Sequence, residues 1–312
     1  MILTGKAKLA GVLGWPVGHS RSPRLHGFWL EQKNIDGAYL PLAVRPEDFE
    51  SAVRSLVRLG FKGANVTVPH KEAALRLADE VEPLARRIGA VNTLVFREDG
   101  SILGRNTDAF GFIENLRHGH PGFSAAKAPA VVLGAGGAAR AVVAALQDDG
   151  CPEIRLLNRT RARATEVAEE LEHSFNPSSP GLTRGSMTGG DESSWMAGSS
   201  PAMTNTKITV WDWSDRDAAL AGAGLLVNTT TLGMTGQPPL EINLEALPKD
   251  ALVNDIVYAP LMTDLLLAAK ARGNPVVDGL GMLLHQARPG FAAWFGEMPE
   301  VTDELRKFVG EL

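Results

Sequence analysis

Short apolar runs alternate with amphipathic stretches along the first hundred residues of the chain. Such runs predict buried β-strands, whereas apolar residues spaced three and four apart predict helices. The predicted strands are residues 9–15, 38–44, 63–68 and 89–96, and the predicted helices are 22–32, 46–60 and a segment from about residue 71. Strands that alternate with helices are typical of an α/β domain.

The same alternation starts again after residues 118–129, a stretch that predicts a linker. A buried strand at 131–133 runs into a glycine turn and an alanine-rich helix. The later predicted strands are residues 153–160, 207–213, 224–230, 251–258 and 274–279, with a helix at 161–172. This succession is typical of a doubly wound parallel sheet. Two terminal helices, 281–296 and 302–312, fit either unit.

We therefore expect an α/β protein of two domains. Residues 1–107, completed by the helices of 280–312, form an α/β domain, and residues 108–279 form a Rossmann-type domain. Residues 174–206 interrupt the second domain; they are rich in Ser, Gly, Pro and Thr and show no period, which predicts a disordered or surface insert. After the insert, the chain enters the third predicted strand of this sheet at the sheet's amino edge, whereas ligands bind at its carboxyl edge. The insert should therefore lie far from the chemistry.

Composition narrows the possible functions. Of the 312 residues, 44% are hydrophobic and 21% are charged, with a net charge of −5. We expect no binding to nucleic acid or to a membrane, because the chain has neither a basic cluster nor an apolar run of roughly 18 residues. The single cysteine, Cys151, fits a buried position in a cytoplasmic protein. The histidines form no metal-binding motif; His118 and His120 predict a solvated loop, with a metal pair as the alternative.

The glycine turn of the second unit predicts a dinucleotide site. Gly134, Gly136 and Ala139 follow the G-x-G-x-x-A pattern directly after a strand and at the start of a helix. Small residues allow the backbone to approach a pyrophosphate, whose charge the free N–H groups of the helix start can bind. A strand–helix turn without a ligand is the alternative.

The end of the following strand selects the dinucleotide. NAD sites carry an acidic residue there, which binds the ribose 2′-hydroxyl. This chain has Asn158, Arg159 and Thr160, with Arg163 one helical turn later. Guanidinium groups favour a 2′-phosphate, so we predict NADP; the alternative is that both arginines are solvated surface residues.

A nicotinamide cofactor without a metal implies hydride transfer assisted by an organic acid or base. The Tyr-x-x-x-Lys pair of short-chain dehydrogenases is excluded, because Ala43 and Met262 stand four residues after the two tyrosines. A His–Asp pair remains open, although no histidine has a convincing position at a strand end. Lys71 is the unusual residue: Pro69 ends a strand, and Lys71 then falls in the first turn of a helix, where the dipole disfavours a cation.

Nine segments, in the same order, resemble the shikimate dehydrogenase family. They lie between residues 11 and 287, interrupted only by the insert, and are GWPVGHSRSPRLH, GANVTVPHK, GAVNTL, GRNTDAFG, GAGGAAR, NRTRAR, VNTTTLGM, DIVYAP and DGLGMLLHQA. The resemblance implies reversible NADPH-dependent reduction of 3-dehydroshikimate to shikimate, a step toward chorismate and the aromatic amino acids. It also implies that the first domain binds substrate, the second binds NADP, and the active site lies in the cleft between them.

The resemblance implies a role for each matching residue. Lys71 and Asp108 match the catalytic pair. The expected contacts to the substrate carboxylate are Ser20, Ser22 and Tyr258, and those to the ring hydroxyls are Asn65, Thr67, Asn92, Asp108 and Gln286. The expected cofactor contacts are Gly134, Ala135, Gly136, Gly137 and Ala138 at the pyrophosphate, Asn158, Arg159, Thr160 and Arg163 at the 2′-phosphate, and Ile256 and Gly279 near the nicotinamide. The chain departs from the family pattern at Gly27, Thr230 and Thr231, to which we attach no change in chemistry.

Some of these residues also have simpler explanations. Ser22 precedes a proline and fits a helix N-cap, Asp108 fits a cap as well, and Asn92 fits a turn. We expect Lys71 to be the acid–base residue, because the positive helix start eases the loss of its proton. Asp108 should chiefly fix the position of the ammonium group.

Two other functions stay open at this stage. One is a quinate/shikimate dehydrogenase that uses NAD, although Arg159 and Arg163 argue against it. The other is a non-catalytic sensor that binds NADP or shikimate, although a sensor has no need of both Lys71 and Asp108. In every case the expected partner is a small molecule, shikimate or 3-dehydroshikimate, and the sequence leaves a monomer and a homodimer open.

Overall fold

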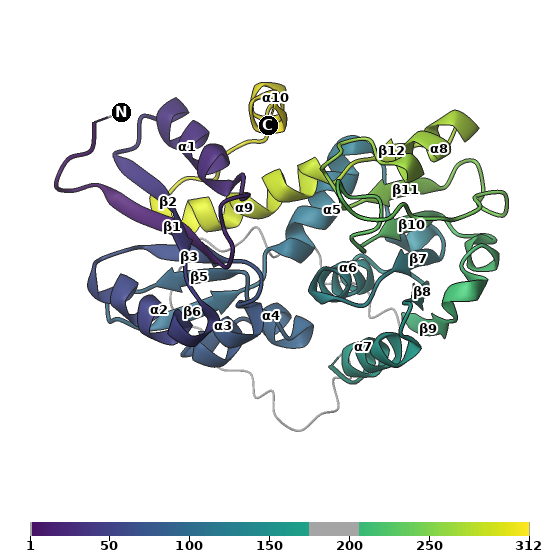
Figure 1. Ribbon diagram of the computed structural model, residues 1–312, viewed down its shortest axis with the longest axis horizontal. Coiled ribbons are helices and arrows are strands. Elements are labelled where there is room, and N and C mark those ends of the chain that lie inside the picture. The colour runs from purple at the N-terminus through teal and green to yellow at the C-terminus, as the bar shows by residue number, and fades with distance from the viewer. Residues whose placement is uncertain (1, 175–205, 312) are drawn as a thin grey trace.

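Within residues 2–174 and 206–311, which the computed structural model describes, the strands form two six-stranded sheets at opposite ends of the molecule (Figure 1). The strands of the first sheet are β1 (Lys8–Gly14), β2 (Gly37–Ala43), β3 (Gly63–Val66), β4 (Glu80–Val81), β5 (Thr93–Phe96) and β6 (Ile102–Arg105). The helices around it are α1 (Ser22–Gln32), α2 (Phe49–Arg58), α3 (Lys71–Leu77) and α4 (Pro83–Ile88).

The first sheet is mixed and has the order β2-β1-β3-β5-β6-β4. β1 pairs in parallel with β2 and β3, whereas β5 runs antiparallel to both β3 and β6. The α/β character of this half is as predicted, but β4 and β6 were not predicted. β6 follows a tight turn at Asp99 and Gly100, where Gly100 has a φ of 84°. Asp-Gly is a hairpin signal, so this strand was open to prediction.

The second sheet is parallel throughout and has the order β12-β11-β10-β7-β8-β9. Its strands are β7 (Ala130–Leu133), β8 (Glu153–Leu157), β9 (Lys207–Trp211), β10 (Leu225–Asn228), β11 (Leu252–Asp255) and β12 (Val276–Val277). Its flanking helices are α6 (Gly137–Asp148), α7 (Arg161–Ser174) and α8 (Asp264–Arg272). This strand order is that of the doubly wound dinucleotide-binding sheet, which confirms the predicted fold class. Cys151 is buried just before β8, as expected.

Two helices, α5 (Asp108–Gly119) and α9 (Leu280–Phe295), cross between the sheets and pack against each other (Figure 1). α5 carries the chain from the first sheet to the second, and α9 carries it back. The two helices come close at Gly111, which lies directly against the backbone of Gln286. The last helix, α10 (Asp303–Gly310), packs against α1 and α9.

Two expectations about connecting segments have different outcomes. α5 continues through His118, so the prediction of a loop at this histidine is wrong; the helical hydrogen bonds simply run on to Gly119.

The predicted insert at 174–206 lies outside the described residues except at its two ends. Beyond it, β9 begins at Lys207, which pairs with Glu153 at the start of β8. The chain therefore enters this strand at the amino edge of the sheet, as expected.

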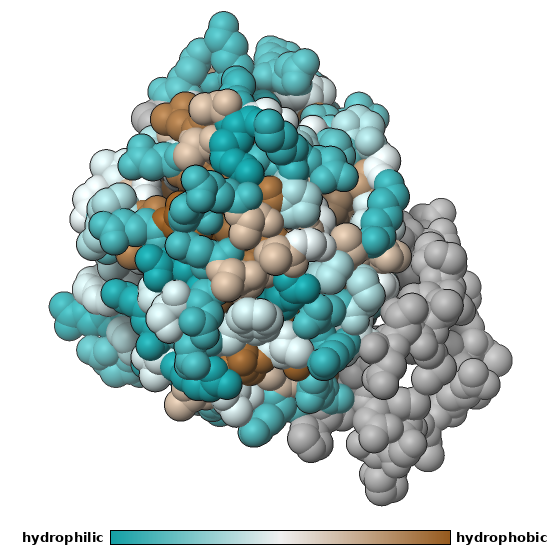
Figure 2. Space-filling model, turned by 90° about the vertical axis from the view of Figure 1, so that its right-hand side faces the viewer, coloured by the Kyte–Doolittle hydropathy of each residue, from teal (hydrophilic) through white to brown (hydrophobic). Residues whose placement is uncertain are grey.

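Each sheet has its own apolar core. Leu94 and Ile102 are buried in the core of the first sheet, and Val132 and Leu156 in that of the second. On the face shown in Figure 2, apolar residues of the described chain form small groups separated by hydrophilic ones. None of the described helices is both long and apolar enough to cross a membrane.

Candidate active site

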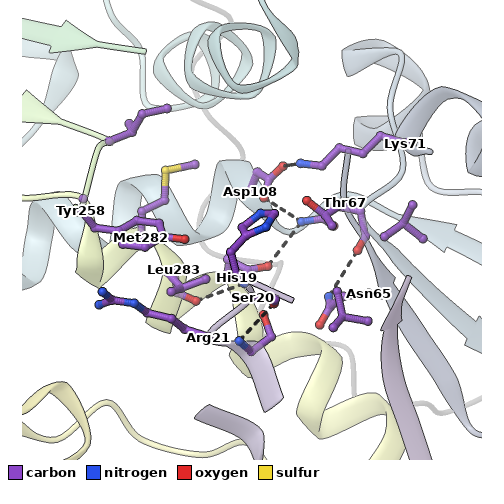
Figure 3. A pocket seen from close by; sticks show the side chains of 17 residues that line it. His19, Ser20, Arg21, Asn65, Thr67, Lys71, Asp108, Tyr258, Met282 and Leu283 are labelled. Carbon is purple, nitrogen blue, oxygen red and sulfur yellow. Dashed lines mark hydrogen bonds and ion pairs between the residues drawn. The ribbon is translucent and has the colours of Figure 1, made fainter. Parts of the chain in front are cut away.

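A cavity of about 230 Å³ lies where β1 and β3 end, facing α9 and the end of β11 (Figure 3). Every residue that we expected to contact the substrate lines this cavity: Ser20, Ser22, Asn65, Thr67, Lys71, Asn92, Asp108, Tyr258 and Gln286. Ile256 and Gly279, the two positions expected near the nicotinamide, line it as well. The fold thus brings together side chains from both sheets and from the crossing helices.

Lys71 and Asp108 form an ion pair inside this cavity. Nζ of Lys71 lies 2.5 Å from Oδ2 of Asp108, and the two side chains are 26% and 13% exposed (Figure 3). Lys71 is the first residue of α3, as predicted. The buried ring of His70 donates a hydrogen bond of 2.8 Å to the carbonyl of Val44, which anchors the start of this helix to the end of β2.

A second contact holds Asp108 from its other oxygen. Nδ2 of Asn92 donates to Oδ1 of Asp108 at 2.8 Å. Asp108 begins α5, but Thr107 occupies the N-cap position, so the capping explanation for Asp108 is wrong. Its carboxylate is instead turned toward Lys71 and Asn92, where both of its oxygens accept hydrogen bonds.

Ser20, Ser22 and Tyr258 also line the cavity, and Arg21 stands between the two serines in the chain. Ser22 is the first residue inside α1, so the N-cap position falls on Arg21 and not on Ser22. The capping explanation for Ser22 is therefore wrong as well. The guanidinium of Arg21 lies 5.3 Å from the ring centre of Tyr258 and donates to the carbonyl of Val309 in α10. Arg21 thus adds positive charge beside the two serines.

The glycine loop after β7 has the shape that a pyrophosphate requires. Gly134 has a φ of 113°, and a side chain there would meet Oγ1 of Thr229 at 2.4 Å. Around Gly136 and Gly137 nothing lies within 4 Å of the place a side chain would take, so the start of α6 is open to a ligand. This twelve-residue helix has no side-chain cap, and the N–H groups at a helix start favour an anion.

The segment after β8 lies next to this loop, since the Gly134 N–H donates to the carbonyl of Leu157. Arg159 and Arg163 are exposed, and neither forms an ion pair with any residue of the described chain. The Asn158 side chain donates to the carbonyl of Thr160 and so shapes the turn. Two exposed guanidinium groups beside the glycine loop, unpaired within the described chain, fit a 2′-phosphate.

Asp255, at the end of β11, organises the wall near Ile256. Its Oδ1 accepts from the Val257 N–H and from Nδ2 of Asn228, while Oδ2 accepts from the Thr263 hydroxyl at 2.7 Å. Burial raises the pKa of Asp255, and these three hydrogen bonds oppose that rise only in part. The network fixes the backbone on which Ile256 stands.

Gly279 is a close-approach glycine at the same wall. A side chain there would lie 2.2 Å from the carbonyl oxygen of Ile256. Any larger residue would therefore push apart the two segments that the resemblance places near the nicotinamide.

Sequence reasoning missed six residues of the cavity wall: Val12, His19, Arg21, Val66, Met282 and Leu283. Met282 and Leu283 stand four and three positions before Gln286 on α9, so helical periodicity alone places them on its face. Within the described residues, no group of three or more His, Cys, Asp or Glu is arranged to hold a metal.

Comparisons with known proteins show which proteins this chain is similar to. A family model described as the shikimate dehydrogenase substrate binding domain matches residues 12–94, and one described as shikimate / quinate 5-dehydrogenase matches residues 119–179. A shikimate dehydrogenase (NADP(+)) from Paramagnetospirillum magneticum is 61% identical over 307 residues, which cover 98% of this chain and 99% of the relative.

Solved structures give the same result. The shikimate 5-dehydrogenase from Thermus thermophilus, in complex with NADP(H) and shikimate, has a TM-score of 0.75 at 34% identity and 97% coverage of both chains. The quinate dehydrogenase from Corynebacterium glutamicum, in complex with NAD, has a TM-score of 0.82 at 28% identity, with 98% of this chain and 99% of that one covered. Both shikimate and quinate enzymes are thus similar to this chain.

Proposed function

The chain belongs to the shikimate dehydrogenase family, and from this premise we propose that Lys71 and Asp108 are the catalytic pair of an NADP-dependent oxidoreductase acting on a CH–OH group. The reaction is the reversible reduction of 3-dehydroshikimate to shikimate. The observation that carries the proposal is the contact of 2.5 Å between Lys71 Nζ and Asp108 Oδ2 inside the cavity that all expected substrate contacts line.

NADPH, when bound, supplies the hydride that reduces the carbonyl carbon. The carbonyl oxygen then gains negative charge and needs a proton. The ammonium of Lys71 donates that proton, which leaves a neutral amine and an alcohol. In the reverse direction the neutral amine of Lys71 takes the proton from the hydroxyl group. Asp108 holds Nζ in place during both steps.

The remaining polar residues of the cavity orient the substrate in our proposal. Ser20, Ser22 and Tyr258 bind the carboxylate, and the positive charge of Arg21 favours an anion at this end. The ring hydroxyls bind at the opposite end, to Asn65, Thr67, Asn92 and Gln286. A substrate held at both ends presents one carbonyl to Lys71, and this fixed orientation is a large part of the rate enhancement.

We propose the same division of labour between the two halves that the sequence suggested. Residues 1–107 with 280–312 bind the substrate, and residues 108–279 bind the cofactor through the glycine loop and the two arginines after β8. The open space above Gly136 and the exposed guanidinium groups support this assignment. A cytoplasmic location and a monomeric or homodimeric state stay predictions.

A spectrophotometric assay at 340 nm tests the function directly. Shikimate and quinate are each paired with NADP and with NAD, and the highest kcat/KM is expected for shikimate with NADP. The family model that names both substrates makes quinate the second candidate. Turnover of quinate with NAD alone would reverse the assignment, and tight NADP binding without any turnover would indicate a sensor.

A further inference from the structure

A row of buried polar side chains leads away from Oδ1 of Asp108. Nδ2 of Asn92 donates to that oxygen at 2.8 Å, and Oδ1 of Asn92 accepts from the Thr93 hydroxyl at 3.0 Å. The same hydroxyl accepts from Nδ2 of Asn65 at 3.1 Å. The row ends at Tyr39, whose hydroxyl donates to Oδ1 of Asn65 at 2.6 Å. Thr93 is 0% exposed and is not among the described residues that line the cavity.

Two backbone groups fix the direction of this row. An amide side chain can be turned by half a rotation, which exchanges its oxygen and nitrogen. The Thr107 N–H points at one end of Asn92 at 2.9 Å, so that end must be the oxygen. The carbonyl of Asn92 lies 3.2 Å from one end of Asn65, which must be the nitrogen. The Thr93 hydroxyl therefore accepts from Asn65, and its single hydrogen faces Oδ1 of Asn92 at 3.0 Å, with Oγ1 of Thr107 as a more distant neighbour at 3.3 Å.

The fixed direction matters for the carboxylate of Asp108. With Asn92 as observed, an N–H group faces the carboxylate; with Asn92 reversed, an amide oxygen would face it and repel it. Thr93 joins Asn92 to Asn65, because Asn65 and Thr93 lie directly opposite each other where β3 and β5 pair antiparallel. Burial also keeps the proton on Tyr39, since it raises the pKa of the phenol well above its usual value.

We infer that Thr93 is a positioning residue of the reaction: its hydroxyl bridges the two amides, whose orientation the backbone groups set, and through Asn92 it holds Asp108 toward Lys71. The inference rests on the proposed function, because it concerns the same catalytic pair. It assigns no contact with substrate to Thr93 itself.

The test compares Thr93→Val, which keeps the shape and loses the hydroxyl, with Thr93→Ser, which keeps the hydroxyl. At saturating NADP, Thr93→Val should lower kcat/KM for shikimate about tenfold, since a buried partner is lost on each side. Thr93→Ser should stay within about twofold of the wild type. Thr206→Val is the matched control, because Thr206 is buried far along the chain and its hydroxyl has no partner among the described residues.

A double-mutant cycle separates positioning from general destabilisation. If Thr93 acts through Asn92, adding Thr93→Val to the Asn92→Ala variant should lower kcat/KM by less than about a further twofold. If Thr93 had a merely structural role, Thr93→Val would lower kcat/KM by the same tenfold with and without Asn92→Ala. Should Thr93→Val not fold, Tyr39→Phe breaks the row at its far end and should lower kcat/KM about threefold.

Equal losses in Thr93→Val and Thr93→Ser, or full additivity with Asn92→Ala, would overturn the inference. So would wild-type kinetics in Thr93→Val or, if that variant does not fold, in Tyr39→Phe. A wild-type protein that does not oxidise shikimate with NADP would instead refute the proposed function. The two failures are therefore distinguishable.

Discussion

Gly111→Ala should lower kcat/KM, although Gly111 is not among the described residues that line the cavity. Gly111 lies on α5 where that helix meets α9. A methyl group there would lie 2.5 Å from Cβ of Gln286 and 2.8 Å from the carbonyl oxygen of Met282. Because both helices continue into other contacts, the clash can be relieved only by a shift of one helix against the other. Gln286, an expected substrate contact, stands on the helix that must move.

The size of the effect follows from these distances. To reach the 3.4 Å at which Cβ contacts become ordinary, α5 and α9 must separate by about 0.9 Å. Misplacement of about 1 Å can cost up to roughly 100-fold in rate, so we expect kcat/KM for shikimate to fall by about 10- to 100-fold. Overpacking of this kind costs about 1–3 kcal/mol, which the gain of about 1 kcal/mol from replacing a helical glycine offsets only in part.

Gly27→Ala supplies the matched control, because Gly27 is also helical and nothing lies within 4 Å of its missing side chain. Both variants gain the same helix propensity, so the difference in their free energies of unfolding isolates the clash. The assay combines urea unfolding with shikimate kinetics at saturating NADP. Wild-type kinetics and stability in Gly111→Ala would refute the close packing of α5 on α9.

Two further predictions concern charge. Arg159→Gln and Arg163→Gln should each raise KM for NADP about tenfold and leave KM for NAD unchanged, because charge-assisted hydrogen bonds to a 2′-phosphate are lost. Steady-state kinetics check this. The control is Arg161→Gln, because the Arg161 side chain is paired with Asp212 at 2.8 Å. Complete burial lowers the pKa of His26 to about 3, below its value in the unfolded chain, so the stability it contributes is present above pH 6.5 and is lost as the pH falls toward 3. Between pH 8 and pH 5 the free energy of unfolding measured in urea should therefore fall by roughly 2 kcal/mol less for His26→Phe than for the wild type. An unchanged pH dependence would contradict the burial of a neutral ring.

Local patterns were enough to predict most of the fold. Helix α1 was predicted with its observed bounds, because a serine–proline start and a regular apolar spacing mark it clearly. The parallel second sheet followed from the succession of buried strands. Strand β6 was missed because only alternate positions of it are buried, so it does not form a continuous apolar run. The N-cap of α1 was misplaced by one residue, because the exact start of the helix depends on the loop before it, where Oγ of Ser20 accepts from the Ser22 N–H at 3.3 Å.

In the candidate site too, residues that stand in local motifs were predictable, whereas roles that depend on long-range contacts were not. Residues such as Lys71 and Gly134 stand in contiguous motifs whose geometry is local, so their places were predictable. The role of Thr93 was not, because it depends on the antiparallel register that sets it opposite Asn65, and that register joins segments 28 residues apart. Likewise, the contact of Arg21 with Tyr258 joins the two halves of the molecule, which no local pattern encodes.

The most direct test of the account is the turnover number of Lys71→Met with shikimate and NADP. The variant keeps the apolar stem and removes the group that gives and takes the proton. With an unchanged melting temperature and with shikimate still bound, kcat should fall by about 10²- to 10⁴-fold, the usual contribution of a general acid or base. A near-normal kcat in a folded Lys71→Met protein would contradict the assignment of Lys71 as the acid–base residue.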